Sequence, residues 1–111
     1  MKMVFEKPYT FEETVYNDYD LNLENLTGMD LKEAEKMRAA YAGNGEFMAV
    51  PATDMTFCLV IAAIASNLPF EFFAGMPADE CYAAYNVVSS FLFGKLAKKN
   101  NAPQLKSEKS A

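Results

Sequence analysis

Histidine is absent from this sequence of 111 residues. Its absence removes the commonest general base, the commonest metal ligand and the usual partner of a nucleophilic serine or cysteine. The two cysteines, Cys58 and Cys81, lie in separate apolar segments without Cys-x-x-Cys spacing, so they do not predict a zinc site. They are typical of free thiols buried as small hydrophobic side chains. We therefore expect no catalytic residue, no metal and no cofactor, and a protein that is not an enzyme.

The sequence also lacks a phosphate-binding loop and a dinucleotide fingerprint, because Gly43-Asn44-Gly45 is a short turn without the rest of either pattern. Residues 18–24 have Asp, Asp, Asn and Glu at alternate positions, and the Asp-x-Asp-x-Asn spacing resembles the start of a calcium-binding loop. However, Leu23 stands where that loop requires glycine, and Met29 stands where it requires a bidentate glutamate. A strand with one solvated face explains the alternation better, which leaves little support for a carboxylate enzyme.

No hydrophobic run is long enough to cross a membrane. The longest run, residues 57–65, has nine residues, whereas a helical span requires about 20. The N-terminal residues 1–8 have no apolar core of the length found in secretory signals. We therefore expect a cytoplasmic protein without a membrane partner.

Positive charge is scarce in most of the chain. Residues 1–94 hold fourteen acidic and five basic side chains, whereas residues 95–111 hold five lysines and one glutamate. An acidic body repels phosphate, so we expect no nucleic-acid partner. With 51% apolar residues the chain is typical of one globular domain. A domain this small is marginally stable, and association with a partner or with itself would add to its stability.

The residue pattern predicts an α+β fold, in which an N-terminal β-hairpin is followed by three main α-helices. Alternating apolar residues predict the hairpin over about residues 3–23, although Glu12-Glu13 lacks the Asn-Gly or Asp-Gly signal of a tight turn. Capping signals and apolar spacing predict helices over about residues 28–42, 54–67 and 77–94. Residues 1–97 should form a single domain, and the lysine-rich residues 98–111 a disordered basic tail.

Particular residues mark the starts of these helices. Thr27 and Asp30 form a variant of the capping box, Asp54 is a favourable N-cap, and Pro77 is a favourable first residue. The helix after Asp54 is apolar on all sides. This pattern predicts a central buried element, or one that lies partly in an oligomer interface.

Aromatic residues are abundant between residues 70 and 93. Some of them must fill the core, but three consecutive large apolar residues at 91–93 cannot all lie on one buried stripe of a helix. Further phenylalanines lie in a short connection between two helices. We expect the remaining aromatic surface to bind a partner protein. The candidate partner-binding residues are Phe70, Phe72, Phe73, Met76, Tyr82, Phe91 and Phe93.

Short motifs follow one another over about residues 3–93. They are Phe5-Glu6-Lys7-Pro8, Leu21-Asn22-Leu23, Leu26-Thr27-Gly28-Met29-Asp30-Leu31, Ala62-Ala63-Ile64-Ala65-Ser66-Asn67-Leu68-Pro69, Pro77-Ala78-Asp79 and Val87-Val88-Ser89-Ser90-Phe91-Leu92. In order and spacing this series resembles the tail assembly chaperones of long-tailed bacteriophages and related prophages. Two positions depart from the family pattern: Glu12-Glu13 replaces a glycine-containing turn, and Met76 stands where leucine is usual.

The resemblance implies a non-enzymatic protein of the bacterial host cytoplasm. Such a protein coats the tape measure protein, keeps it soluble and helps to recruit tail tube subunits, without remaining in the mature virion. A groove on a small helical body with exposed aromatic residues would suit an amphipathic helix of that partner. The alternative is an acidic adaptor or inhibitor that binds a basic partner. The two differ in salt dependence, because an electrostatic complex weakens with ionic strength and a hydrophobic one does not.

Overall fold

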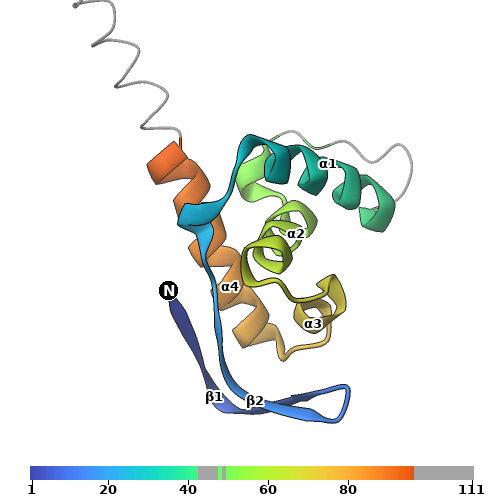
Figure 1. Ribbon diagram of the computed structural model, residues 1–111, viewed down its shortest axis with the longest axis vertical. Helices are drawn as coiled ribbons and strands as arrows, with labels where there is room; N and C mark the ends of the chain where they lie inside the picture. The colour runs from blue at the N-terminus through green and yellow to red at the C-terminus, as the bar shows by residue number, and fades with distance from the viewer. Residues whose placement is uncertain (43–47, 49, 97–111) are drawn as a thin grey trace, which may run out of the picture.

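A computed structural model describes residues 1–42, 48 and 50–96 of the chain. Within these residues an antiparallel two-stranded hairpin is followed by helices, so the predicted α+β fold is confirmed (Figure 1). The strands are β1 (Lys2–Phe11) and β2 (Thr14–Asp20). The helices are α1 (Gly28–Ala42), α2 (Met55–Ser66), α3 (Phe70–Ala74) and α4 (Ala78–Ser90). Short 3₁₀ turns, η1 (Leu23–Asn25) and η2 (Pro51–Thr53), precede α1 and α2, and a π-helical segment, η3 (Phe91–Leu96), continues α4.

Two predictions concern segments outside the described residues. These are the turn at 43–45 and the basic tail at 98–111. The three main helices begin and end close to their predicted positions, whereas α3 replaces what the sequence indicated to be a connection. Because α4 begins at Ala78, Pro77 is its N-cap rather than its first residue.

The hairpin turns tightly at Glu12 and Glu13, without the glycine that such turns usually contain. Both residues have positive φ angles, of 48° and 68°, as the two central residues of a type I′ turn require. The strand pairing is irregular between Val4 and Tyr9. On β2, Tyr16 is half-buried and Tyr19 is buried, whereas the apolar Val15 is 59% exposed.

The second strand is shorter than the sequence indicated. It ends at Asp20, and the chain then bends so that the Asn22 N–H donates to the carbonyl of Ala65 in α2, at 3.2 Å. Leu21 and Leu23 are nevertheless buried, with 1% and 6% of their surface exposed. The apolar alternation therefore identified core residues correctly but extended the strand too far.

The predicted starts of the first two helices are confirmed by hydrogen bonds. The Thr27 N–H donates to Asp30 Oδ2 at 2.9 Å, and the Asp30 N–H donates to Thr27 Oγ1 at 3.2 Å, which together form a reciprocal capping box. Asp54 Oδ1 accepts from the Phe57 N–H at 2.7 Å and caps α2. These bonds satisfy backbone donors that have no partner within the first turn.

Helix α2 is the centre of the fold, as its all-round apolar sequence indicated. Eight of its twelve residues are buried, and it contacts α1, α3 and α4 (Figure 1). Cys58, in its first half, is fully buried as a free thiol, whereas Cys81 is only partly buried. The prediction of a buried thiol is thus confirmed for Cys58 and holds in part for Cys81.

An aromatic cluster attaches the hairpin to the helices. Phe72 of α3 lies at its centre, with ring-centroid distances of 4.9 Å to Tyr16 and 5.1 Å to Tyr9. The Tyr9 hydroxyl also donates to the Phe72 carbonyl at 2.8 Å. Gly75 makes this approach possible, because a Cβ atom there would lie 3.1 Å from the Tyr9 hydroxyl. The short helix α3 therefore places Phe72 in contact with the hairpin.

The strand β1 is also joined to α4 by a polar contact. The backbone N–H of Glu6, within the irregular part of β1, donates to Glu80 Oε2 at 2.8 Å. Glu80 lies in the first turn of α4. One carboxylate thus connects a strand to a helix 74 residues away along the chain.

Candidate partner-binding site

The structure separates the seven predicted partner-binding residues into buried and accessible groups. Phe72 and Phe73 have no exposed surface, and Met76 has 6%. The expectation that these three belong to an exposed surface is wrong, because all three lie in the core, where Phe72 and Phe73 of α3 pack against Tyr19 of the hairpin. Their large apolar side chains are therefore explained by packing in the core.

Phe70 lies at a different place, on the surface between α1 and α3. Its ring is half-buried and stacks on Tyr41, with centroids 4.0 Å apart and an interplanar angle of 20°. The Tyr41 hydroxyl donates to Glu71 Oε2 at 3.3 Å. These residues border a hollow of about 430 Å³ that also contacts Met37 and Leu68. A ring already stacked within its own chain has less surface to offer a partner.

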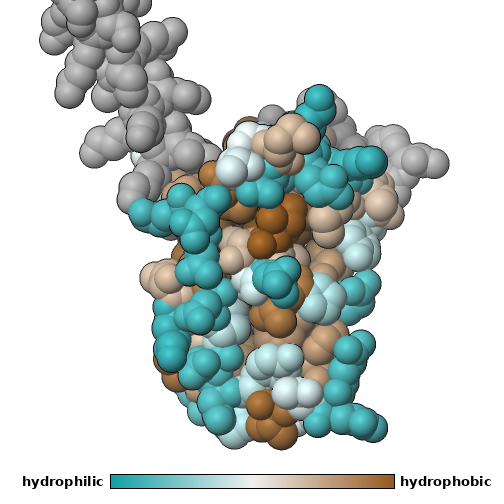
Figure 2. Space-filling view, viewed as in Figure 1, coloured by the Kyte–Doolittle hydropathy of each residue, from teal (hydrophilic) through white to brown (hydrophobic). Residues whose placement is uncertain are grey.

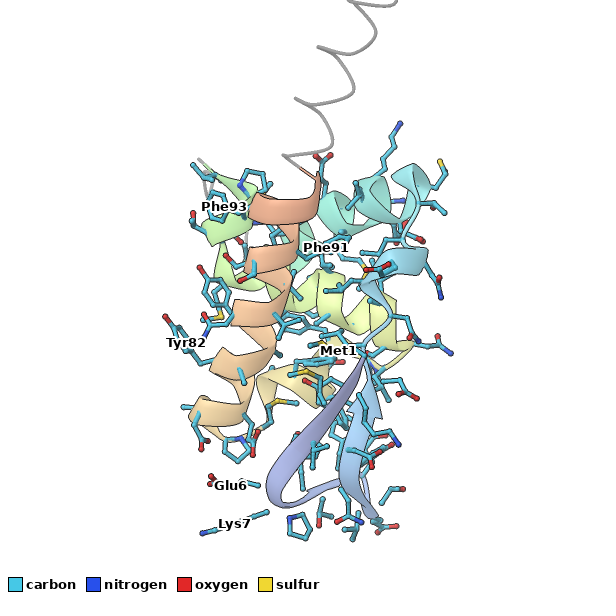
Figure 3. The ribbon with its side chains drawn as sticks, turned by 90° about the vertical axis from the view of Figure 1, so that its left-hand side faces the viewer. Met1, Glu6, Lys7, Tyr82, Phe91 and Phe93 are labelled. Carbon is cyan, nitrogen blue, oxygen red and sulfur yellow. The ribbon has the colours of Figure 1, made fainter. Side chains whose placement is uncertain are left out.

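Tyr82 and Phe93 are the most exposed of the seven, with 54% and 53% of their surface accessible. Figure 3 shows both on the side of α4 and η3 that faces away from the hairpin. Tyr82 lies beside Tyr85, with ring centroids 5.5 Å apart, and the Tyr85 hydroxyl donates to the carbonyl of Thr53. The expectation that some aromatic surface stays exposed is confirmed for Tyr82 and Phe93.

Phe91 lies on the opposite side of the same helix. It is half-buried, and Figure 3 shows it on the other side of the helix from Phe93, above Met1. Phe91 and Phe93 therefore point to different faces, as expected for residues two positions apart in a helix. The structure brings no more than two of the seven predicted residues together on one accessible face.

Phe91 lines an open groove of about 690 Å³ between α4 and the segment that leads from the hairpin to α1. We call it the α4 groove. Its residues are Met1, Leu21, Asn22, Leu23, Glu24, Asn25, Asn86, Val87, Ser90 and Phe91. Apolar side chains line both walls, and Met1, with 67% of its surface exposed, lies at the edge. Its mostly apolar lining with a few polar side chains is typical of a binding surface.

The two walls of the α4 groove differ in charge. The hairpin wall carries Glu24 and follows directly on Asp18 and Asp20, which are exposed on β2. On the same wall the Lys2 ammonium lies 4.0 Å from Asp18 Oδ2, and the Met1 ammonium donates to the carbonyl of Leu21. Among the residues that the structure describes, those of α4 and η3 that line the groove are uncharged: Asn86, Val87, Ser90 and Phe91. Figure 2 shows hydrophilic side chains along the edge of the molecule formed by β2 and the segment after it.

Sequence analysis identified Phe91 but missed the other groove residues. Leu21, Leu23 and Val87 occur in the sequence motifs of the resemblance, but no pattern shows that they border a hollow. The walls of the groove come from segments about 65 positions apart, which a local pattern cannot bring together.

The described residues contain no group of three acidic or cysteine side chains that could hold a metal ion. Burial raises the pKa of the Cys58 thiol to about 12, and the nearby charge of Asp54 adds to the effect. At neutral pH this thiol is therefore protonated, and it lies 3.6 Å from the Ala52 carbonyl as a weak donor. Burial also raises the pKa of Cys81.

In the part of the chain that the structure describes, no helix is long and apolar enough to cross a membrane. Comparisons with protein-family models, with curated proteins and with solved structures found no match for this chain. The resemblance to tail assembly chaperones therefore rests on the sequence motifs, and the α4 groove is the feature of the structure on which a function can be argued.

Proposed function

We propose that this protein is a non-enzymatic tail assembly chaperone of a long-tailed phage or prophage, which binds the tape measure protein and helps to recruit tail tube subunits. It acts in the bacterial host cytoplasm and is not part of the mature virion. The observation that carries the proposal is the α4 groove, an open apolar hollow on a small body. The series of sequence motifs supplies the identity of the partner.

The exposed apolar lining of the groove supports a binding role. Apolar residues that remain accessible on a small protein, rimmed by polar side chains, mark interaction sites. Here Met1 and Phe91 remain accessible at the edge of a core of eighteen buried apolar residues, two of which, Leu21 and Leu23, also line the groove. The acidic surface around the groove favours solubility at high protein concentration. A chaperone that coats a much longer partner needs both properties.

The proposal is tested by co-expression with the tape measure protein encoded in the same genome. We expect that partner to become soluble and to co-purify with the unmodified chain. Ser90→Trp, at an exposed position in the groove, should fill the hollow and reduce recovery of the partner severalfold. Glu33→Trp, on the exposed side of α1, is the matched control and should leave recovery unchanged. An insoluble tape measure protein in the presence of the unmodified chain would contradict the proposal.

The acidic surface supports a second candidate, an adaptor or inhibitor that binds a basic partner through charge. Residues 1–94 carry fourteen acidic and five basic side chains, and those of β2 are exposed. A complex of this kind should dissociate as salt rises from about 0.1 M to about 0.5 M, because added ions screen exposed charges. A complex held by the apolar groove should persist over the same range.

A further inference from the structure

We draw no further inference here: the strongest candidate, the exposed side of α4 and η3 that carries Tyr82 and Phe93, is an apolar surface patch, and nothing among the residues that the structure describes shows what covers it.

Discussion

Arg38 of α1 and Asp54, the N-cap of α2, form a hydrogen-bonded ion pair, with Arg38 Nη2 2.8 Å from Asp54 Oδ2. Both side chains are largely buried, with exposed fractions of 6% and 16%. Asp54 simultaneously accepts from the Phe57 N–H. One carboxylate therefore caps the central helix and holds the first helix against it.

We predict that Asp54→Ala lowers the free energy of unfolding by about 3 kcal/mol, since it removes a cap and the partner of a buried cation. Asp54→Asn keeps a capping oxygen and should cost less, about 2 kcal/mol. Asp30→Ala, at the exposed cap of α1, provides the comparison and should cost about 1 kcal/mol. Urea unfolding measures all three. Equal losses for Asp54→Ala and Asp30→Ala would show that the ion pair contributes nothing.

Asp54 also makes the fold sensitive to acid. Its burial disfavours the charged form, but the hydrogen bonds from Arg38 and Phe57 and the charge of Arg38 together hold the pKa of Asp54 below its ordinary value. Because the folded-state pKa is lowered, the stabilisation is complete above the unfolded-state pKa, near pH 4, and is lost as pH falls through the folded-state pKa. The urea concentration at which half of the unmodified chain is unfolded should therefore decrease as the pH is lowered below about 4. This decrease should be smaller for Asp54→Asn.

Tyr19 should weaken the fold at alkaline pH. Burial raises the pKa of its hydroxyl to about 12, with further contributions from Glu80 and Cys81. Between about pH 10 and pH 12 the unfolded chain loses a proton that the folded chain retains, so stability decreases as pH rises. Tyr19→Phe keeps the ring that packs on Phe73 and should lose less stability over this range. Identical alkaline profiles for the two proteins would contradict this assignment.

The glutamate turn of the hairpin is a site where stability can be gained. Residues other than glycine and asparagine pay a steric penalty at positive φ, and both Glu12 and Glu13 have such angles. We expect Glu12→Asn with Glu13→Gly to raise the free energy of unfolding by about 1–2 kcal/mol. The control is Glu12→Gln with Glu13→Gln. It removes the same two charges but keeps side chains that disfavour a positive φ. A gain of equal size in the control would assign the effect to charge.

Phe72 and Phe93 should differ in how much their truncation destabilises the fold, although both were candidates for the same surface. Phe72→Ala removes the centre of the aromatic cluster and should cost about 3–5 kcal/mol of stability. Phe93→Ala removes a ring that is 53% exposed and should change stability by less than about 0.5 kcal/mol. Thermal unfolding of the two variants measures the difference.

The elements predicted well from sequence are those with local signals. The Thr27–Asp30 capping box, the Asp54 cap and the all-round apolar run of α2 each predicted the structure found. Capping bonds and helix periodicity depend on residues a few positions apart, so the sequence contains the whole pattern.

What failed was the assignment of aromatic residues to core or surface. Phe72 and Phe93 are both phenylalanines of the aromatic-rich segment, so the sequence does not distinguish them. They differ in burial because α3 packs against a hairpin more than fifty positions away. The α4 groove has the same non-local origin. The turn at Glu12-Glu13 was located correctly despite its weak signal, and that signal is weak because cross-strand pairing imposes a backbone geometry that its own residues disfavour.

The contact between Glu6 and Glu80 has a consequence for the behaviour of the protein in bulk. A free strand edge is a template on which a neighbouring molecule can add a strand, and crowded solutions favour this route to aggregation. The Glu80 carboxylate occupies a donor on the edge of β1, in the stretch where the pairing with β2 is irregular. An incoming strand would have to displace this acceptor before it could pair with β1 at Glu6.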